Sequence, residues 1–224
     1  GEGRIDADAF PGLGELANDA TFARNHTAVS PSTTSAVPAI LSGKYPSDPS
    51  ALPTAQDHPR NLFTLLGADY TMRAGENVTE VCPSSMCATP DTENTTPTNP
   101  VISLLKTSRI IFSGNAVPFN IGLSGVDPGA RFEWLASGFD DTYDQPVLHY
   151  LHTMLPHQDW DRLPDGRYHD APDPPVGLTG RNIDDDPATA QLVRQRHLLQ
   201  LAYADSLVAQ TLQALHEAGI YDDA

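Results

Sequence analysis

The sequence predicts an α/β fold with a largely parallel central sheet flanked by helices. Helical and β-type segments alternate along the chain, and the strongest β-type segment, Val147–Leu151, is mostly apolar instead of alternating apolar and polar. Such a run is typical of a buried strand in a parallel sheet. No internal repeat or linker-like break divides the 224 residues, so we expect a single domain over residues 1–224.

The N-terminal part predicts two helices joined by an extended run. A short helix is expected at Leu13–Asn18, followed by extended chain at Thr21–Val29. The next helix follows a hydroxyl-rich stretch, and Pro38 is tolerated only near a helix start. We therefore expect this helix to begin within Thr33–Val37 and to end at Gly43.

The middle of the chain predicts short elements separated by polar loops. A loop rich in Pro and Asp covers Tyr45–Pro59, a helix covers Asn61–Leu66 and a strand covers Tyr70–Ala74. The Thr-, Pro- and Asn-rich segment Cys82–Pro100 is expected to be a long surface loop. The amphipathic segment Asn99–Gly114 is expected to be a helix.

The last element is a long amphipathic helix. After the strand at Val147–Leu151 a polar loop extends to about Gly180. Asp186 is the expected N-cap, Pro187 occupies the first helical position and Gly219 ends the helix. Its apolar side chains keep helical spacing at Leu201, Leu207, Val208, Leu212 and Leu215.

Charge argues against nucleic acid and membrane surfaces as partners. The chain has 29 acidic and 13 basic residues and a net charge of −16, whereas nucleic acid and anionic lipid attract clustered Lys and Arg. The longest apolar stretch, Val101–Phe112, contains two basic residues and is too short to cross a bilayer. We expect no nucleic-acid partner and no direct membrane contact from this segment.

The two cysteines, Cys82 and Cys87, lie close together in the sequence. Their spacing suits a small disulfide-closed loop, which would imply an oxidising compartment. Two free thiols are the alternative. A metal site would need more ligands than this stretch provides.

A cluster of hydroxyl residues at a helix N-terminus is the first candidate site. Backbone amides and the helix dipole favour phosphate or sulfate there, and a Ser or Thr could act as nucleophile. The alternative is a polar turn in which one residue caps the helix. Among the histidines, His157 follows the predicted strand, whereas His149 and His152, on opposite faces of that strand, are better explained by themselves as packed, hydrogen-bonded strand residues. Asp205 could be a solvated or capping carboxylate.

Four stretches together resemble the sulfatase family of the alkaline phosphatase superfamily. Pro11–Ala17 matches the family's first motif, Phe22–Asn25 its Phe-x-Asn strand, and Ser42–Pro46 its Thr-Gly-Arg-Tyr-Pro segment. The family's nucleophile precedes that glycine by ten residues, which selects Thr33, with Thr34 as the neighbour that a shift by one residue would select.

The later part of the chain continues this resemblance. Pro156-His157 resembles the family's Pro-His pair, which contacts the anionic group of the ester, and Asp205 takes the acidic position of the following helix. The resemblance implies an alkaline phosphatase/sulfatase-like fold. It also implies a small-molecule or cell-envelope sulfate or phosphate ester as substrate, with His157, His152 and Lys44 as expected binding residues.

The chain departs from the sulfatase pattern at the nucleophile. Residues 33–37 lack the Pro, Ser and Arg of Cys-x-Pro-Ser-Arg, which removes the formylglycine route. A Thr here resembles the phosphodiesterases and phosphoglycerol transferases of the superfamily, in which it is both metal ligand and attacking group. The resemblance thus implies a hydrolase or transferase that uses a divalent metal (Mn, Zn, Ca or Mg).

The family's terminal metal ligands lie outside the matched motifs. We expect a truncated domain of a longer protein, because one acidic ligand would precede the first motif and an Asp-His pair would follow the last helix. This segment alone is then expected to be inactive and to bind no metal. The expected location is extracellular or in the cell envelope, including the outer domain of a membrane protein. The alternative function is a non-catalytic extracytoplasmic binding module that retains the fold.

Overall fold

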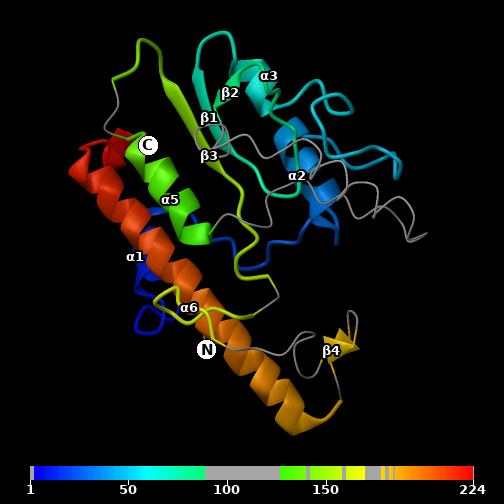
Figure 1. Ribbon diagram of the computed structural model, residues 1–224, viewed down its shortest axis with the longest axis vertical. Helices are drawn as coiled ribbons and strands as arrows, with labels where there is room; N and C mark the ends of the chain where they lie inside the picture. Colours follow the sequence, from blue (N-terminus) through cyan, green and yellow to red (C-terminus); the bar gives the residue numbers. More distant parts are fainter. Residues whose placement is uncertain are drawn as a thin grey trace, which may run out of the picture. The chain divides into compact units, whose positions relative to one another are not determined.

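The computed structural model describes residues 3–88, 127–139, 142–157, 160–169, 178–179, 182–183 and 185–223. They form two compact units (Figure 1). The terminal unit comprises Gly1–His26 and Thr153–Ala224, and the central unit comprises Thr27–His152. The single-domain interpretation stays a prediction.

The central unit contains a three-stranded parallel sheet in the order β2-β1-β3. Its strands are β1 (Thr71–Gly75), β2 (Cys87–Ala88) and β3 (Val147–Leu151). The predicted α/β fold with a parallel sheet is confirmed. The middle strand β1 is buried along most of its length, whereas β3 is half-buried throughout, so the expectation that Val147–Leu151 is the best buried strand is wrong. Among the described strands, β3 pairs with β1 alone.

Helices cover both faces of this sheet. Successive side chains of a strand point to opposite faces, so β1 contacts the helices on both sides. On one face Arg73 packs against α5 (Pro128–Ser137), donating to the Trp134 carbonyl at 2.7 Å with its guanidinium 4.6 Å from the Trp134 ring centroid. A side chain at Gly138 would leave no room for Arg73, since a Cβ there would lie 2.3 Å from its Nε.

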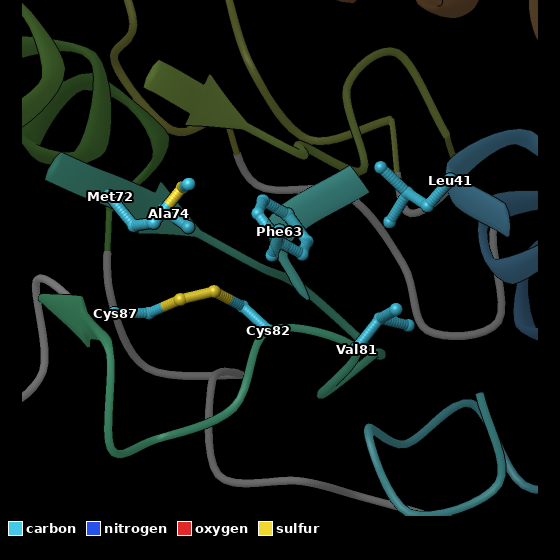
Figure 2. Close-up of a cluster of buried hydrophobic side chains, with 7 residues drawn as sticks. All are labelled: Leu41, Phe63, Met72, Ala74, Val81, Cys82 and Cys87. Atoms are coloured by element: carbon cyan, nitrogen blue, oxygen red, sulfur yellow. A yellow bond between two sulfur atoms is a disulfide. The ribbon is translucent and has the colours of Figure 1, made fainter. Parts of the chain in front are cut away.

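The other face of the sheet carries the hydrophobic core of the central unit (Figure 2). Met72 and Ala74 of β1 pack there with side chains from α2 (Thr33–Ser42) and α3 (Leu62–Leu66) and with the cysteine pair. The buried members of this core are Leu41, Phe63, Met72, Ala74, Val81, Cys82 and Cys87. Tyr150 of β3 adds an edge-to-face contact with Phe63, with ring centroids 5.2 Å apart.

The cysteines form the predicted disulfide, with Cα atoms 6.2 Å apart. Both are more than nine-tenths buried. Cys87 also lies in β2, so the prediction of a continuous surface loop from residue 82 is wrong at residues 87–88. Its strand pairing with Met72 places the disulfide beside the centre of the sheet.

Helix α2 begins at Thr33, as expected, and ends where Gly43 takes a left-handed conformation with φ of 65°. Pro38 is therefore the sixth helical residue and lies inside the helix. Proline has no N–H, so it cannot donate to the Thr34 carbonyl one turn earlier. Its ring is fully buried, and this packing compensates for the missing hydrogen bond.

The terminal unit is built on two helices, α1 (Pro11–Asp19) and α6 (Pro187–Glu217). Asp186 caps α6 by accepting from the Thr189 N–H at 2.8 Å, and Gly219 follows the helix with φ of 72°, both as predicted. The unit also contains a short antiparallel pair, β4 (Leu178–Thr179) and β5 (Asn182–Ile183), and a 3-10 turn, η1 (Tyr221–Asp223).

Some predictions are corrected or lie outside the described residues. Residues 21–29 form no strand, since the chain turns at Arg24–Asn25. The predicted helix Asn99–Gly114 and most of the predicted loop 82–100 fall outside the described part. Among the helices that are described, none combines the length and apolar character needed to span a membrane.

Candidate functional site

A groove in the central unit runs along one face of α2. Its α2 wall carries Ser35, Ala39 and Ser42, which recur at helical spacing, with Thr34 beside them. The cavity has a volume of about 310 Å³. Its other wall is the loop that follows α2, and the residues lining it are Lys44, Tyr45, Pro46, Ser47, Asp48, Ala51, Asp57, His58, Pro59 and Arg60.

The groove follows α2 from its first turn to its last. With a rise of 1.5 Å per residue, Thr34 and Ser42 are separated by about 12 Å along the axis. The Thr34 end of the groove lies at the positive end of the helix dipole, which favours an anionic ligand. Lys44 brings a cationic side chain just beyond the other end.

The hydroxyl cluster before α2 is bonded within itself. The Ser32 and Thr34 hydroxyls are 2.8 Å apart, and the Ser30 hydroxyl accepts from the Ser32 N–H at 3.2 Å. Ser32 is the N-cap, yet its side chain makes no capping hydrogen bond. The extra hydroxyls thus fix the side chain of Thr34 instead of closing the first turn of the helix.

Two of the predicted site residues, Thr34 and Lys44, line this groove. Thr33 is the first residue of α2 and is half-buried, but it is not among the lining residues. Within this one cavity, the structure therefore distinguishes Thr34 from its neighbour.

The second wall of the groove contributes charged residues that sequence reasoning did not select. Arg60 and His58 line it together with Asp48 and Asp57. Asp48 accepts from the Ser50 hydroxyl at 2.6 Å and from the Ser50 N–H at 2.9 Å, and these bonds lower the pKa of Asp48 below its usual range. The sequence signal that could have identified them is the polar tetrapeptide at residues 57–60, which lies in the loop between α2 and α3.

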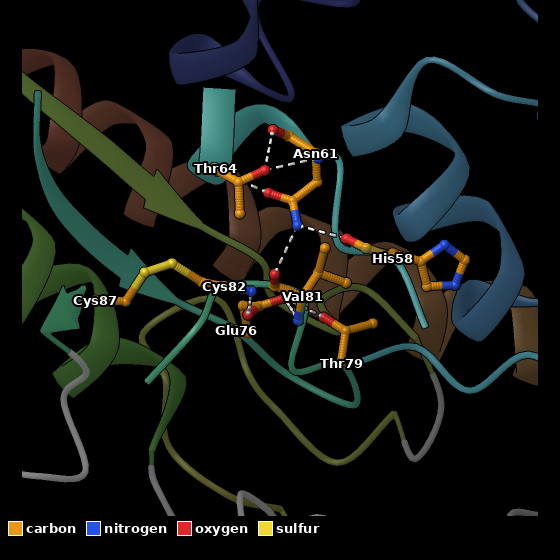
Figure 3. Close-up of a disulfide and its surroundings, with 8 residues drawn as sticks. All are labelled: His58, Asn61, Thr64, Glu76, Thr79, Val81, Cys82 and Cys87. Carbon is orange, nitrogen blue, oxygen red and sulfur yellow. Dashed lines mark hydrogen bonds between the residues drawn. A yellow bond between two sulfur atoms is a disulfide. The ribbon is translucent and has the colours of Figure 1, made fainter. Parts of the chain in front are cut away.

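Asn61 anchors the loop that carries His58 and Arg60 (Figure 3). Its side-chain amide donates to the His58 carbonyl at 2.8 Å and to the Val81 carbonyl at 3.0 Å. Its oxygen accepts from the Thr64 N–H at 3.1 Å, completing a capping box at the start of α3. In Figure 3 the His58 imidazole points away from this network, and His58 lines the groove.

Glu76 organises the carboxyl end of β1. Its carboxylate accepts from the Thr79 hydroxyl at 2.8 Å, the Val81 N–H at 3.0 Å and the Cys82 N–H at 2.8 Å. These bonds hold a turn in which Val78 has a φ of 56°, an uncommon value for a β-branched residue. Glu76 thereby connects the central strand to the disulfide loop.

His152 follows β3 within the same unit and does not line the α2 groove. Burial lowers the pKa of His152, and the Arg131 charge acts in the same direction, while the Asn77 backbone and Glu76 oppose them. Burial, assisted by Glu76, raises the pKa of Tyr150 to about 12. These surroundings favour a neutral imidazole at the end of the sheet.

His157 belongs to the terminal unit and is exposed. It lines a shallow hollow with Met154, Pro156, Trp160 and His197. The Trp160 indole donates to the Pro156 carbonyl at 3.1 Å, and the Gln200 side chain donates to the His157 carbonyl. The backbone of the Pro-His pair is thus held by two side chains.

Asp205 is buried, at 3% exposure, in the terminal unit. It accepts from the backbone N–H groups of Gly12 at 3.2 Å and Leu13 at 2.7 Å. Of the two roles considered for it, the capping role is correct, but the capped helix is α1 and not its own.

The comparisons with known proteins give one finding. The family model described as Sulfatase matches residues 5–224. The chain belongs to the sulfatase family. No curated protein and no solved structure matches it significantly.

Within this sulfatase domain the family motifs occupy defined places. Pro11–Ala17 begins α1, and Ser42–Pro46 covers the end of α2 and the start of the groove's second wall. Sulfatases generally use a divalent metal. The described residues do not fit such a metal, because among them no group of three or more His, Cys, Asp or Glu side chains could hold one.

Proposed function

We propose that this sulfatase-family protein hydrolyses or transfers phosphate or sulfate esters, with the hydroxyl of Thr34 as the nucleophile. The observation that carries the proposal is that Thr34, in the N-terminal turn of α2, and Lys44 line one groove. In a chain of net charge −16, a groove with this lining offers an anionic ester local positive potential.

The proposed reaction needs two displacements. The Thr34 oxygen bonds to phosphorus or sulfur as the bond to the leaving alcohol breaks; the hydroxyl gives up its proton and the leaving oxygen gains one. Water, or an acceptor alcohol in a transferase, then attacks the same centre and releases Thr34. Lys44, just beyond the other end of α2, attracts the anionic substrate into the groove. Thr33 is the alternative nucleophile that the family spacing selects.

The family motif assigns further roles to histidines. We propose that His157 orients or protonates the leaving oxygen and that His152 contributes to substrate binding. His157→Gln is expected to lower kcat with little effect on folding, because the side chain is exposed. Unchanged turnover in this variant would remove His157 from the proposal.

The proposal also includes an extracytoplasmic location and a dependence on divalent metal. The disulfide supports an extracytoplasmic location, in the extracellular space or the cell envelope. Because the family generally uses a divalent metal, turnover by the full-length protein is expected to disappear with a chelator and to return with Mn²⁺, Zn²⁺, Ca²⁺ or Mg²⁺.

The test compares hydroxyl-deleting and hydroxyl-retaining variants of the full-length protein. Bis(p-nitrophenyl) phosphate and p-nitrophenyl sulfate are assayed with each metal. Thr34→Val should lower turnover by roughly 10³-fold or more, whereas Thr34→Ser keeps the attacking oxygen and retains measurable activity. Thr33→Val is the matched control and should remain active.

Two results would contradict the assignment. Full activity in Thr34→Val would exclude Thr34, and loss of activity in Thr33→Val alone would select Thr33. Binding of the anionic substrate without turnover by the wild-type protein, under every metal condition, would favour the non-catalytic binding module.

A further inference from the structure

We propose that Arg60 and His58 form a second anion-binding subsite in the α2 groove, which binds a negatively charged group of the substrate other than the ester attacked at Thr34. The proposal rests on the function proposed above and names its substrate class: an elongated ester with at least two anionic groups.

The second wall of the groove carries basic side chains without partners among the described residues. Within the described part of the chain, the side chains of Arg60 and His58 make no hydrogen bond or ion pair, and the same holds for Lys44. The Arg60 guanidinium is always cationic and presents a fork of donors suited to phosphate, sulfate or carboxylate.

The carboxylates of the groove do not supply this anion. Asp48 is held by the Ser50 hydroxyl and N–H, and Asp57 accepts from the Leu52 N–H at 2.6 Å. Each carboxylate thus closes a turn of its own loop. The groove therefore keeps basic donors that its own acidic residues leave without partners.

The groove is longer than a single phosphate or sulfate requires. The hydroxyl of Thr34 lies at the first turn of α2 and Ser42 at the last, about 12 Å away along the helix axis. A single phosphate or sulfate is far smaller than this span. A substrate that fills the groove while reacting at Thr34 must extend along α2, past the loop that carries the basic residues.

The loop that carries His58 and Arg60 is held by several hydrogen bonds. Asn61 is 96% buried and holds the His58 carbonyl, and the His58 N–H donates to the Thr54 carbonyl at 2.9 Å. Pro59 fixes the backbone between the two basic residues. The loop is held in place before a ligand arrives, which reduces the entropy lost on binding.

The test is calorimetric titration of the full-length protein with two matched probes. Hexanediol bisphosphate carries two phosphates on one linear chain, and hexyl monophosphate carries one. The wild-type protein should bind the bisphosphate at least about tenfold more tightly. Arg60→Gln and His58→Gln should each remove most of this advantage while leaving the monophosphate affinity nearly unchanged.

Arg194→Gln is the charge-matched control, since Arg194 is exposed on α6 and does not line the groove. It should leave both affinities unchanged. Equal affinity for the two probes, or an equal loss for both in Arg60→Gln, would overturn the subsite. If the bisphosphate preference holds but no ester is turned over, the subsite stands and the catalytic proposal fails. If Thr34→Val abolishes turnover but Arg60→Gln does not change binding, the catalytic proposal stands and the subsite fails.

Discussion

The Asp205 carboxylate accepts a hydrogen bond from the Leu13 backbone N–H at 2.7 Å, although 192 residues separate the two in the sequence. The Gly12 N–H donates to the same carboxylate, so one buried side chain caps the first turn of α1. A negative charge at the N-terminus of a helix also interacts favourably with the helix dipole. Asp205 therefore joins α1 to α6 in the terminal unit.

Replacing Asp205 should destabilise the terminal unit. Asp205→Ala leaves buried N–H groups without an acceptor, and we expect a loss of about 3 kcal/mol in the free energy of unfolding. Asp205→Asn keeps one acceptor and should lose less. Urea unfolding measures the difference, with Asp222→Asn as the control at an exposed acidic position. Equal stability of Asp205→Ala and the control would contradict the capping role.

The close approach of α1 to α6 should also be sensitive at Gly12. A Cβ at this position would lie 2.5 Å from the Asp205 carbonyl oxygen and 2.8 Å from the Ala209 nitrogen, both backbone atoms. Because backbone atoms cannot move aside, Gly12→Ala should cost about 1–3 kcal/mol despite the better helix propensity of alanine. A variant as stable as wild type in urea would show that the helices are farther apart.

Asn61 should be needed for its amide donors as well as for its capping oxygen. Asn61→Asp retains the acceptor for the Thr64 N–H but places a carboxylate against the carbonyls of His58 and Val81. We expect a loss of about 3 kcal/mol, because buried donors are replaced by repelling oxygens. Thr64→Ser, which keeps the capping hydroxyl, is the control and should change stability little. A neutral effect of Asn61→Asp in urea unfolding would argue against the anchor.

His152 should give the central unit a specific pH dependence. Burial lowers the pKa of His152 from 6.5, so the folded state disfavours the imidazolium. Above pH 6.5 the residue is neutral in both states; as the pH falls below this value, the unfolded chain binds a proton that the folded chain does not. The free energy of unfolding should therefore fall as the pH drops from 6.5 to the lower pKa of the folded state, below which both states are protonated.

The measurement compares wild type with His152→Gln by urea unfolding at about pH 7.5 and about pH 5. The wild-type protein should lose more stability than the variant on acidification. If both lose the same amount, His152 does not contribute to the acid sensitivity.

Sequence reasoning succeeded where the signals were local. Gly43 ends α2, Asn61 precedes α3 as its N-cap and Pro187 begins α6, and each can be identified from neighbours within a few residues. It failed where a residue acts through a distant partner. The polar composition around Cys87 concealed strand β2, which forms by pairing with Met72.

The same limit applies to the candidate site. The family spacing led to Thr33 and Thr34, but the choice of a groove-lining hydroxyl depends on how α2 packs against the loop after it. Arg60 and His58 were not predicted as site residues, because only the folded loop brings them to the same groove as Lys44. Asp205 was interpreted only as a solvated or capping carboxylate, since nothing in the sequence pairs it with Leu13.

The most direct test of the proposed function is mass spectrometry of the protein after incubation with substrate. The full-length protein is incubated with bis(p-nitrophenyl) phosphate and a divalent metal, quenched in acid, digested and sequenced. The account predicts a nitrophenylphosphoryl ester on Thr34, absent from the Thr34→Val protein. An adduct on Thr33 or another residue, or active Thr34→Val protein that carries an adduct elsewhere, would contradict it.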